Sequence, residues 1–254
     1  MTYELQRGFA TPKSCSYLPE ETSRLEYRYV MEMEAPEYEA LLARGWRRQG
    51  MCFFRPACPQ CVKCRCLRVD VARFRASKSQ RRCLSRNQDV RLVVRRADVS
   101  KERLALFNAY HADMHERRGW PYRESNSADY FETFLSGRFL FASEFAYYQG
   151  KTLVGLGLVD VTRDALSSIY FYHHPEWRSA GLGPLSVLRE LDYARQTGRR
   201  WLYLGYWIRE NASMSYKNRY EPHEVLERYV GDAEIPNWRD GPEGTREDSP
   251  ENQG

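Results

Sequence analysis

Apolar and polar residues alternate in a regular way near the start of the chain. The residues at every second position of this stretch are Leu25, Tyr27, Tyr29, Met31 and Met33. Successive side chains of a β-strand point to opposite faces of the sheet. This period of two therefore predicts a half-buried strand over residues 25–33.

Further elements of the first half follow from similar patterns. Pro36 has a fixed φ that suits the first turn of a helix, which predicts a short helix. Apolar runs after it predict strands. The expected helix spans 36–42, and the expected strands span 46–54, 67–71 and 91–94. We place the end of this half at residue 97.

A helix opens the second half. Ser100 is a favourable N-cap residue, and Gly119 is a favourable stop. Between them an apolar stripe recurs at helical spacing, which predicts one buried face. The stripe consists of Leu104, Phe107, His111 and Met114.

Three apolar runs then alternate with the turn pairs Gln149-Gly150 and Arg163-Asp164, which predicts an antiparallel meander. A glycine-rich loop, a helix closed by Gly198 and one more strand follow. The expected strands span 139–148, 153–161, 166–172 and 201–207, and the helix spans 184–196. These patterns predict an α+β protein with mixed sheets and helices, divided into residues 1–97 and 98–235.

Charge is distributed unevenly along the 254 residues. Residues 62–96 hold twelve Lys or Arg against two Asp, a net charge of +10, whereas the whole chain carries +5. Residues 231–254 hold two Arg against seven acidic residues, a net charge of −5, and are rich in Pro, Gly and Asn. We therefore predict a polyanion-binding surface on one side of the molecule and an acidic, disordered tail at 236–254.

The centre of the basic region reads FRASKSQRRCLSRNQD at residues 74–89. Ser77 and Gln80 form a capping box that predicts a helix start, and Lys78, Arg82 and Arg86 then stack along one face. Like charges at this spacing oppose helix formation, so a phosphate partner would explain the pattern. Nucleic acid phosphates are bound in this way without base reading. A solvated charged face is the alternative.

No apolar run approaches the length of a membrane span, and the N-terminus lacks the apolar stretch of a signal peptide. These features predict a cytoplasmic protein without a membrane partner. The seven cysteines are then expected to be thiols or metal ligands rather than disulfides.

The cysteines at 58, 61 and 64 have metal-ligand spacing. With Cys15 they complete a candidate four-sulfur site for zinc or an iron–sulfur cluster. Buried free thiols are the alternative. The candidate ligands are Cys15, Cys58, Cys61 and Cys64.

A glycine-rich loop precedes the helix expected at 184–196. Arg178, Gly181 and Gly183 fit an R-x-x-G-x-G pattern that resembles the pyrophosphate loop of the N-acetyltransferase superfamily. Glycines let backbone amides approach a phosphate at a helix N-terminus. A plain strand-to-helix turn is the alternative. The chain has no G-x-x-x-x-G-K-[ST] loop, so an activated group is expected to arrive ready-made.

Residues 203–224, YLGYWIRENASMSYKNRYEPHE, together with the basic helix resemble the aminoacyl-tRNA–protein transferase family, and specifically its bacterial aspartate/glutamate leucyltransferases. The matching segments run through most of the chain and keep their order. They include CSYLP at 15–19, GWRR at 45–48, RP at 55–56, SQRR at 79–82, RNQD at 86–89, YLGYWI at 203–208 and MSYK at 214–217.

The resemblance implies ATP-independent transfer of leucine from leucyl-tRNA to the α-amine of proteins that begin with Asp or Glu, which marks them as N-degrons for proteolysis. It also implies an N-acetyltransferase-like catalytic half, preceded by a smaller α+β half, and no required cofactor. The residues fit this chemistry, because the ester is already activated and an α-amine with a pKa of about 7.7–8.0 is partly neutral at physiological pH. Positioning and oxyanion stabilisation then provide most of the acceleration.

The roles of individual residues are implied by the same resemblance. Candidate catalytic residues are Tyr206, Lys217 and Tyr220. The acceptor carboxylate is assigned to Arg47 and Arg48, with an exposed strand pair as the alternative. The leucyl pocket is assigned to Trp207, Ile208 and Met214, with core packing as the alternative. His174 and Glu210 are the titratable groups nearest to the matched segments. Candidate tRNA-binding residues are Arg75, Lys78, Arg81, Arg82, Arg86, Arg178, Gly181, Gly183 and Arg219.

Two other functions remain open at this point. A coenzyme A-dependent N-acetyltransferase would use the same glycine loop but leaves the basic helix unexplained. A non-catalytic tRNA-binding module would bind charged and uncharged tRNA equally and form no peptide product.

Overall fold

The computed structural model describes residues 2–242. Its strands are β1 (Tyr3–Phe9), β2 (Lys13–Ser14), β3 (Thr22–Ser23), β4 (Leu25–Glu32), β5 (Arg47–Gln49), β6 (Cys52–Pro56), β7 (Arg65–Asp70), β8 (Val90–Arg96), β9 (Ala142–Gln149), β10 (Thr152–Val161), β11 (Ala165–His173), β12 (Trp201–Trp207), β13 (His223–Leu226) and β14 (Trp238–Asp240). Its helices are α1 (Ala35–Ala43), α2 (Lys78–Arg86), α3 (Lys101–Arg118), α4 (Ser127–Tyr130), η1 (Phe131–Leu135), η2 (Pro175–Ala180), α5 (Leu182–Gln196), α6 (Ala212–Ser215) and η3 (Tyr216–Arg219).

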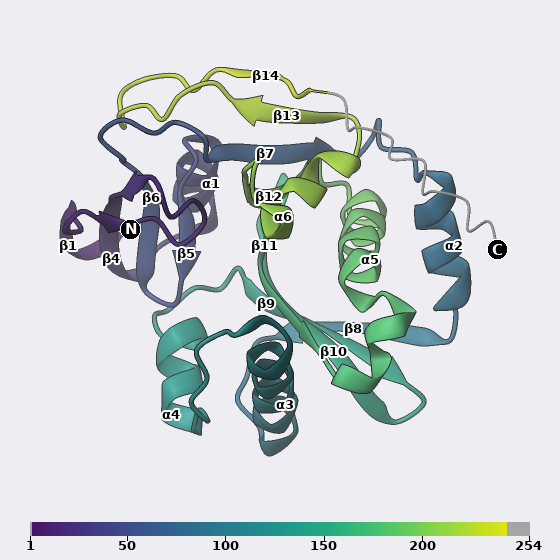
Figure 1. The fold of residues 1–254 in the computed structure, drawn as a ribbon. Helices are drawn as coiled ribbons and strands as arrows, with labels where there is room; N and C mark the ends of the chain where they lie inside the picture. The colour runs from purple at the N-terminus through teal and green to yellow at the C-terminus, as the bar shows by residue number, and fades with distance from the viewer. Residues whose placement is uncertain (1, 243–254) are drawn as a thin grey trace.

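An eight-stranded sheet forms the centre of the molecule (Figure 1). Its strand order is β14-β13-β7-β12-β11-β10-β9-β8, while a four-stranded sheet has the order β1-β4-β6-β5. Strands β11 and β12 are parallel, whereas β9, β10 and β11 form an antiparallel meander. The chain is therefore an α+β protein with mixed sheets, as the sequence predicts.

Helices and the smaller sheet cover both faces of the large sheet. Helices α5 and α2 pack on one face through an apolar core that includes Leu185, Leu188 and Leu202. Helix α1 and the four-stranded sheet share a second core with β12, and α3, α4 and η1 share a third with β10 and β11. Burial of these apolar faces is the main stabilising contribution to the fold.

Local signals located several elements correctly. Ser77 caps α2, and its capping box with Gln80 is present. Ser100 caps α3, and Gly119 ends it in a left-handed conformation. The strand expected at 201–207 is β12. The alternation at 25–33 corresponds to β4, but the face that is buried holds Glu26, Arg28 and Val30, whereas Tyr29 of the apolar face is exposed.

The prediction of one strand over 46–54 was wrong. The chain forms a hairpin there, in which β5 pairs with β6. Gly50 lies in the turn with a φ of +55°, a backbone conformation that L side chains rarely adopt. This glycine was the turn signal within the apolar run.

The large sheet includes strands from both sides of residue 97. Strand β7 lies between β12 and β13, and β8 is the edge strand beside β9. The boundary proposed at residue 97 therefore lies after two strands that belong to the same sheet as β9–β12.

Part of the expected tail is ordered, which corrects the prediction of disorder from residue 236. Strand β14 pairs with β13, and Trp238 donates a hydrogen bond to the Ala43 carbonyl at 3.0 Å. The Arg68 guanidinium lies 3.9 Å from the ring centroid of Trp201 and 4.1 Å from that of Trp238. Stacking of this kind is favourable where the cation is partly desolvated. Residues 243–254 lie outside the described residues.

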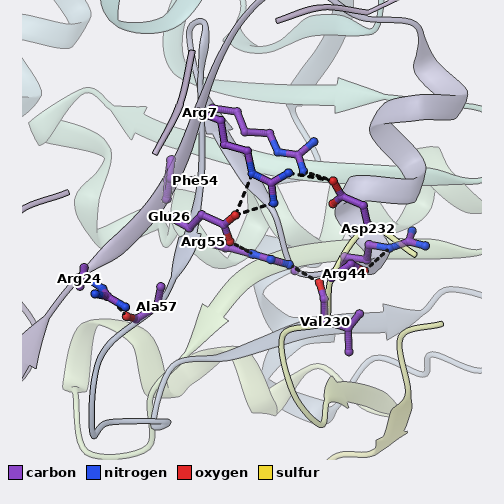
Figure 2. A network of polar contacts seen from close by, with 12 residues as sticks. Arg7, Arg24, Glu26, Arg44, Phe54, Arg55, Ala57, Val230 and Asp232 are labelled. Carbon is purple, nitrogen blue, oxygen red and sulfur yellow. Dashed lines mark hydrogen bonds and ion pairs between the residues drawn. The ribbon is translucent and has the colours of Figure 1, made fainter. Parts of the chain in front are cut away.

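An ion-pair network joins the four-stranded sheet to the segment after β13 (Figure 2). Arg7 binds Glu26 at 2.7 Å and Asp232 at 3.0 Å. Arg55 binds the other carboxylate oxygen of Glu26 at 2.7 Å and donates to the Val230 carbonyl at 2.6 Å. The N-terminal sheet and the end of the described chain are thereby held together.

Within residues 2–242, no helix combines the length and the hydrophobicity that crossing a bilayer requires.

Candidate functional site

The central feature is a separation of β11 from β12. The two strands pair only from Ala165 to Ser167, opposite Trp201 to Tyr203, although both continue further. The pairing of β12 with β7 changes register between Tyr203 and Gly205, and Gly205 has a φ of +81°. Such a bulge bends a strand and redirects its side chains, and bulges are common beside active sites. The bend coincides with the gap between β11 and β12.

Arg47 projects into this gap from β5. It donates a hydrogen bond to the Ser168 carbonyl, which is the first carbonyl beyond the paired part of β11. A Cβ atom at Gly205 would lie 3.5 Å from its Nε, so the guanidinium lies beside the space that a side chain at position 205 would fill. Arg47 is only 5% exposed, and its Nη1 atom has no hydrogen-bond partner among residues 2–242. The residue predicted to bind a carboxylate therefore has a free donor inside the protein.

Glu190 approaches the same place from helix α5. Its side chain is fully buried, and the Ser168 hydroxyl donates to its Oε1 atom at 3.4 Å. Burial raises the pKa of Glu190 to about 8, against the opposing effects of Ser168 and Arg47. Its Oε2 atom has no partner in the described part of the chain. The sequence did not single out Glu190, although an acid among the buried Val187, Leu191 and Ala194 of one helix was an available signal.

Lys217 is the third ionisable group of this region. Its Nζ atom donates to the Tyr206 carbonyl at 2.7 Å and lies 3.5 Å from the Met214 sulfur. Burial lowers the pKa of Lys217 to about 7, and the positive charge of Arg47 adds to this effect. A group that exchanges its proton near neutral pH is suited to proton transfer.

Arg48 has a different environment from Arg47. It forms a two-pronged ion pair with Asp160 of β10, with the Nε–Oδ2 contact at 2.8 Å, and both side chains are buried. Its guanidinium also lies 4.9 Å from the Phe139 ring centroid. Because Asp160 already binds this arginine, we expect Arg48 to have a structural role rather than to bind the acceptor carboxylate.

Helix α2 and the glycine loop lie side by side. Arg86 donates to the Ser179 carbonyl at 3.0 Å, Asn87 to the Ala180 carbonyl at 2.9 Å, and the Cys83 thiol to the Gly181 carbonyl at 3.5 Å. Two motifs that are far apart in sequence therefore form one surface.

The other predicted tRNA-binding residues surround this surface. Lys78, Arg81, Arg82 and Arg86 are exposed. Arg75 and Arg81 also donate to nearby carbonyls of their own segment, and Arg178 forms an ion pair with Asp113 of α3. Gly181 is left-handed at the start of α5, and a Cβ atom at Gly183 would meet no atom within 4 Å in the described structure. Arg219, in η3, has an exposed side chain.

The predicted tyrosines lie in apolar cores. The Tyr206 hydroxyl lies 3.1 Å from the carbonyls of both Gly45 and Phe54, which share its single proton, so its donor is already used. Tyr220 is buried with its ring 6.3 Å from that of Phe74. Of the three catalytic candidates, Lys217 therefore has the environment that best suits proton transfer.

The expected leucyl-pocket residues do not gather in one cavity. Trp207 lines a cavity of about 510 Å³ whose other walls include Arg65, Arg209 and Arg239. Ile208 is fully buried, and Met214 contacts Lys217.

The two titratable groups near the matched segments are both at the surface. His174 accepts a hydrogen bond from the Glu176 backbone at 3.3 Å, and Glu210 lines the cavity beside Trp207. Glu190, which the sequence analysis missed, is instead a fully buried acid beside Ser168 of β11.

The four cysteines of the candidate metal site lie in one region. Burial raises the pKa of Cys64 to about 12, and the neighbouring thiols Cys58, Cys15 and Cys61 contribute. All seven cysteines are free thiols. In residues 2–242 no set of three or more His, Cys, Asp or Glu side chains is arranged to hold a metal ion. A zinc or iron–sulfur site formed by these thiols stays a prediction.

Comparison with known proteins defines the class of protein to which this fold and site belong. Residues 13–82 match the family model described as "Arginine-tRNA-protein transferase, N terminus", and residues 102–227 match the model described as "Arginine-tRNA-protein transferase, C terminus". Both halves are therefore those of a tRNA–protein transferase.

The chain belongs to the family of aspartate/glutamate leucyltransferases. It is 32% identical over 230 residues to the member from Helicobacter hepaticus, covering 91% of this chain and 95% of that protein. It is 34% identical over 223 residues to a member from Campylobacter jejuni, covering 87% and 93%. The member from Halorhodospira halophila is 35% identical, with coverage of 84% and 90%.

Solved structures with partial likeness include the C-terminal domain of a lysylphosphatidylglycerol synthetase from Agrobacterium fabrum, at 14% identity and a TM-score of 0.44, covering 67% of this chain and 51% of that one. L-PGS from Bacillus licheniformis has 10% identity and a TM-score of 0.46, with coverage of 92% and 82%.

Proposed function

We propose that this protein transfers leucine from leucyl-tRNA to the α-amine of proteins that begin with Asp or Glu, in the cytoplasm, where charged tRNA is made. One observation carries the proposal. Helix α5 begins beside the exposed cations of α2 and contains the buried Glu190 further along. At 1.5 Å per residue, Glu190 lies about 12 Å along the axis from Leu182. A polyanion surface and a reaction centre are thus within reach of one extended aminoacyl end.

The proposal that the protein binds tRNA is supported by the exposed basic face of α2. Lys78, Arg82 and Arg86 present three cations on one side of a helix that contains no acidic residue. Such cations bind phosphates and release counterions, which gives affinity without base reading. Identification of leucine must then come from the aminoacyl end or the tRNA body.

The transfer itself needs no energy source besides the ester. The acceptor amine attacks the ester carbonyl carbon, so that a C–N bond forms and the C–O bond to the terminal ribose breaks. The proton lost by the amine ends on the ribose oxygen. In this proposal Arg47 binds the acceptor carboxylate and Lys217, whose pKa is about 7, carries the proton.

The product is a protein with an N-terminal leucine, which we propose is an N-degron for proteolysis. The reaction adds one residue and leaves the rest of the acceptor protein unchanged. Any effect on that protein must therefore come from its new N-terminal residue.

The test uses purified protein, radiolabelled leucyl-tRNA and peptides that begin with Asp, Glu or Lys, without ATP. The expected result is label in the Asp and Glu peptides only. Arginyl-tRNA and acetyl-CoA are run in parallel as donors. Incorporation from either in place of leucine would reassign the donor. Binding of tRNA without any transfer would leave a tRNA-binding module.

A further inference from the structure

Two buried polar side chains, a guanidinium and a carboxyl group, lie on either side of Ser168. Arg47 reaches the Ser168 carbonyl from β5, on the face of the large sheet covered by the smaller one, while Glu190 reaches its hydroxyl from α5 on the opposite face. Each side chain keeps one polar atom, Nη1 and Oε2 respectively, without a partner among the residues described. Ser168 therefore binds two side chains, of which one keeps an unpaired donor and the other an unpaired acceptor.

This arrangement costs stability unless a ligand completes it. A buried polar atom without a hydrogen bond costs about 1–3 kcal/mol, and more when it is charged. The neighbouring Arg48 shows the usual solution, because Asp160 binds it directly through two contacts. Within the described chain, Arg47 and Glu190 form no hydrogen bond with each other. Their charges nevertheless interact, since Arg47 opposes the rise in the pKa of Glu190.

We propose that Arg47 and Glu190 together bind the N-terminal residue of the acceptor, with Nη1 of Arg47 donating to its side-chain carboxylate and Oε2 of Glu190 accepting from its α-amino group. This inference rests on the proposed function and adds Glu190 as the group that reads the free amine. An N-terminal Asp or Glu carries both groups on one residue, namely a side-chain carboxylate and a free α-amino group. An internal acidic residue has no amine, and an N-terminal Lys places a cation against Arg47.

The same geometry positions the nucleophile. A carboxyl oxygen that accepts from the amine keeps its nitrogen in a fixed place beside α5, the helix that begins at the proposed phosphate-binding surface. Glu190 is fully buried, and the separation of β11 from β12 is the place where we infer that the acceptor enters. Tyr216 and Lys217 of η3 lie near Glu190 and Arg47 respectively, since their charges influence each other.

The test pairs protein variants with ligand variants. Two ligands compete against a labelled acceptor: Asp-Ala, and succinyl-Ala, which keeps the carboxylate but lacks the α-amine. Wild-type protein should bind Asp-Ala about 10- to 100-fold more tightly, the factor expected for a charged hydrogen bond. Glu190→Gln should remove most of this preference while leaving the affinity for succinyl-Ala within about threefold of wild type.

Arg47 is tested with the complementary pair, Asp-Ala and Asn-Ala. Wild-type protein should prefer Asp-Ala by about 10- to 100-fold, and Arg47→Met should remove that preference. Asp192→Asn, at a half-buried position of the same helix as Glu190 where the acid pairs with Arg195, is the matched control and should keep both preferences. Glu190→Asp should give an intermediate preference and replaces Glu190→Gln if that variant does not fold.

Stability distinguishes a binding role from a structural one. Glu190→Gln should unfold at the same or a higher temperature than wild type, because it removes a buried acid with an unused oxygen. Equal loss of both ligands together with a lower unfolding temperature would show a structural role and overturn the inference. If Glu190→Gln still preferred Asp-Ala over succinyl-Ala as strongly as wild type does, the inference would also be overturned. If no leucine is transferred by wild-type protein, the proposed function fails, but these affinities still test the two residues.

Discussion

The Nζ atom of Lys217 donates a hydrogen bond to the Tyr206 carbonyl at 2.7 Å, and burial of this contact lowers the lysine pKa to about 7. The carbonyl belongs to β12, beyond the bulge at Gly205 where this strand has left β11. The backbone at the end of the bent strand is thus satisfied by a group that changes its charge near physiological pH.

Replacing this lysine should affect stability in a pH-dependent way. Between a folded-state pKa of about 7 and an unfolded value of about 10.4, the unfolded chain binds more protons, so the stability of wild-type protein gains from rising pH. Lys217→Met should therefore be more stable than wild type at pH 7, by on the order of 3 kcal/mol after the loss of the hydrogen bond to Tyr206 is subtracted. The difference should shrink and reverse towards pH 10, where the variant lacks only the hydrogen bond to Tyr206.

Urea unfolding at pH 7, 8.5 and 10 measures this difference, with the exposed Lys151→Met as matched control. Leucine transfer by Lys217→Met should fall by about 100-fold or more if the amine carries a proton. A variant with wild-type transfer would remove Lys217 from the mechanism, whatever its stability.

The ion pair between Arg48 and Asp160 should be a structural contact. Arg48→Met leaves the Asp160 carboxylate buried and unpaired, which should cost about 3–5 kcal/mol in the free energy of unfolding. The double variant with Asp160→Leu should recover most of this loss. Arg47→Met, which leaves no hydrogen-bonded acid behind, should cost clearly less. Denaturant titrations of the four proteins decide the matter, and equal costs for Arg47→Met and Arg48→Met would contradict the assignment.

The basic face of α2 should dominate the salt dependence of tRNA binding. Each phosphate contact contributes about 0.7–0.9 to the slope of log K against log salt concentration. Lys78→Ala and Arg82→Ala should each lower the slope by about that amount and weaken binding of charged and uncharged tRNA alike. Arg163→Ala, in the exposed turn between β10 and β11, is the matched control. An unchanged slope in both α2 variants would place the tRNA elsewhere.

Gly205 should be required for its backbone conformation rather than for space. A Cβ atom there would make ordinary contact with Arg47, but a φ of +81° is strained for any L side chain. Gly205→Ala should cost roughly 1–2 kcal/mol in unfolding free energy. Gly183→Ala, inside helix α5 with open space around it, should instead be neutral or stabilising. Thermal unfolding of the two variants compares them, and a neutral Gly205→Ala would argue against a strained bulge.

Local signals in the sequence predicted much of the fold. Capping residues such as Ser77 and Ser100 act within one turn of their own helix, so the bounds of α2 and α3 were close to those observed. The glycine loop and the basic helix were both recognised, but their contact through Gly181 and Cys83 was not predictable, because nothing local brings them together.

The candidate site was predicted only in part for the same reason. Arg47 and Arg48 are adjacent and of the same type, yet one meets Asp160 and the other Ser168, and only the folded sheets decide which. Glu190 was overlooked because its neighbours on α5 suggest an ordinary amphipathic helix. An acid among the apolar residues of a helix is itself a sequence signal of a buried polar site.

The position of β7 affects how the protein can fold while the ribosome is still synthesising it. This strand leaves the exit tunnel early, but both of its neighbours, β12 and β13, are translated after most of the chain. Pairings between distant segments form slowly, and unpaired strands are prone to aggregation in the meantime. The centre of the sheet therefore stays open until synthesis is nearly complete, and an N-terminal fragment released early would present an apolar strand to chaperones and proteases.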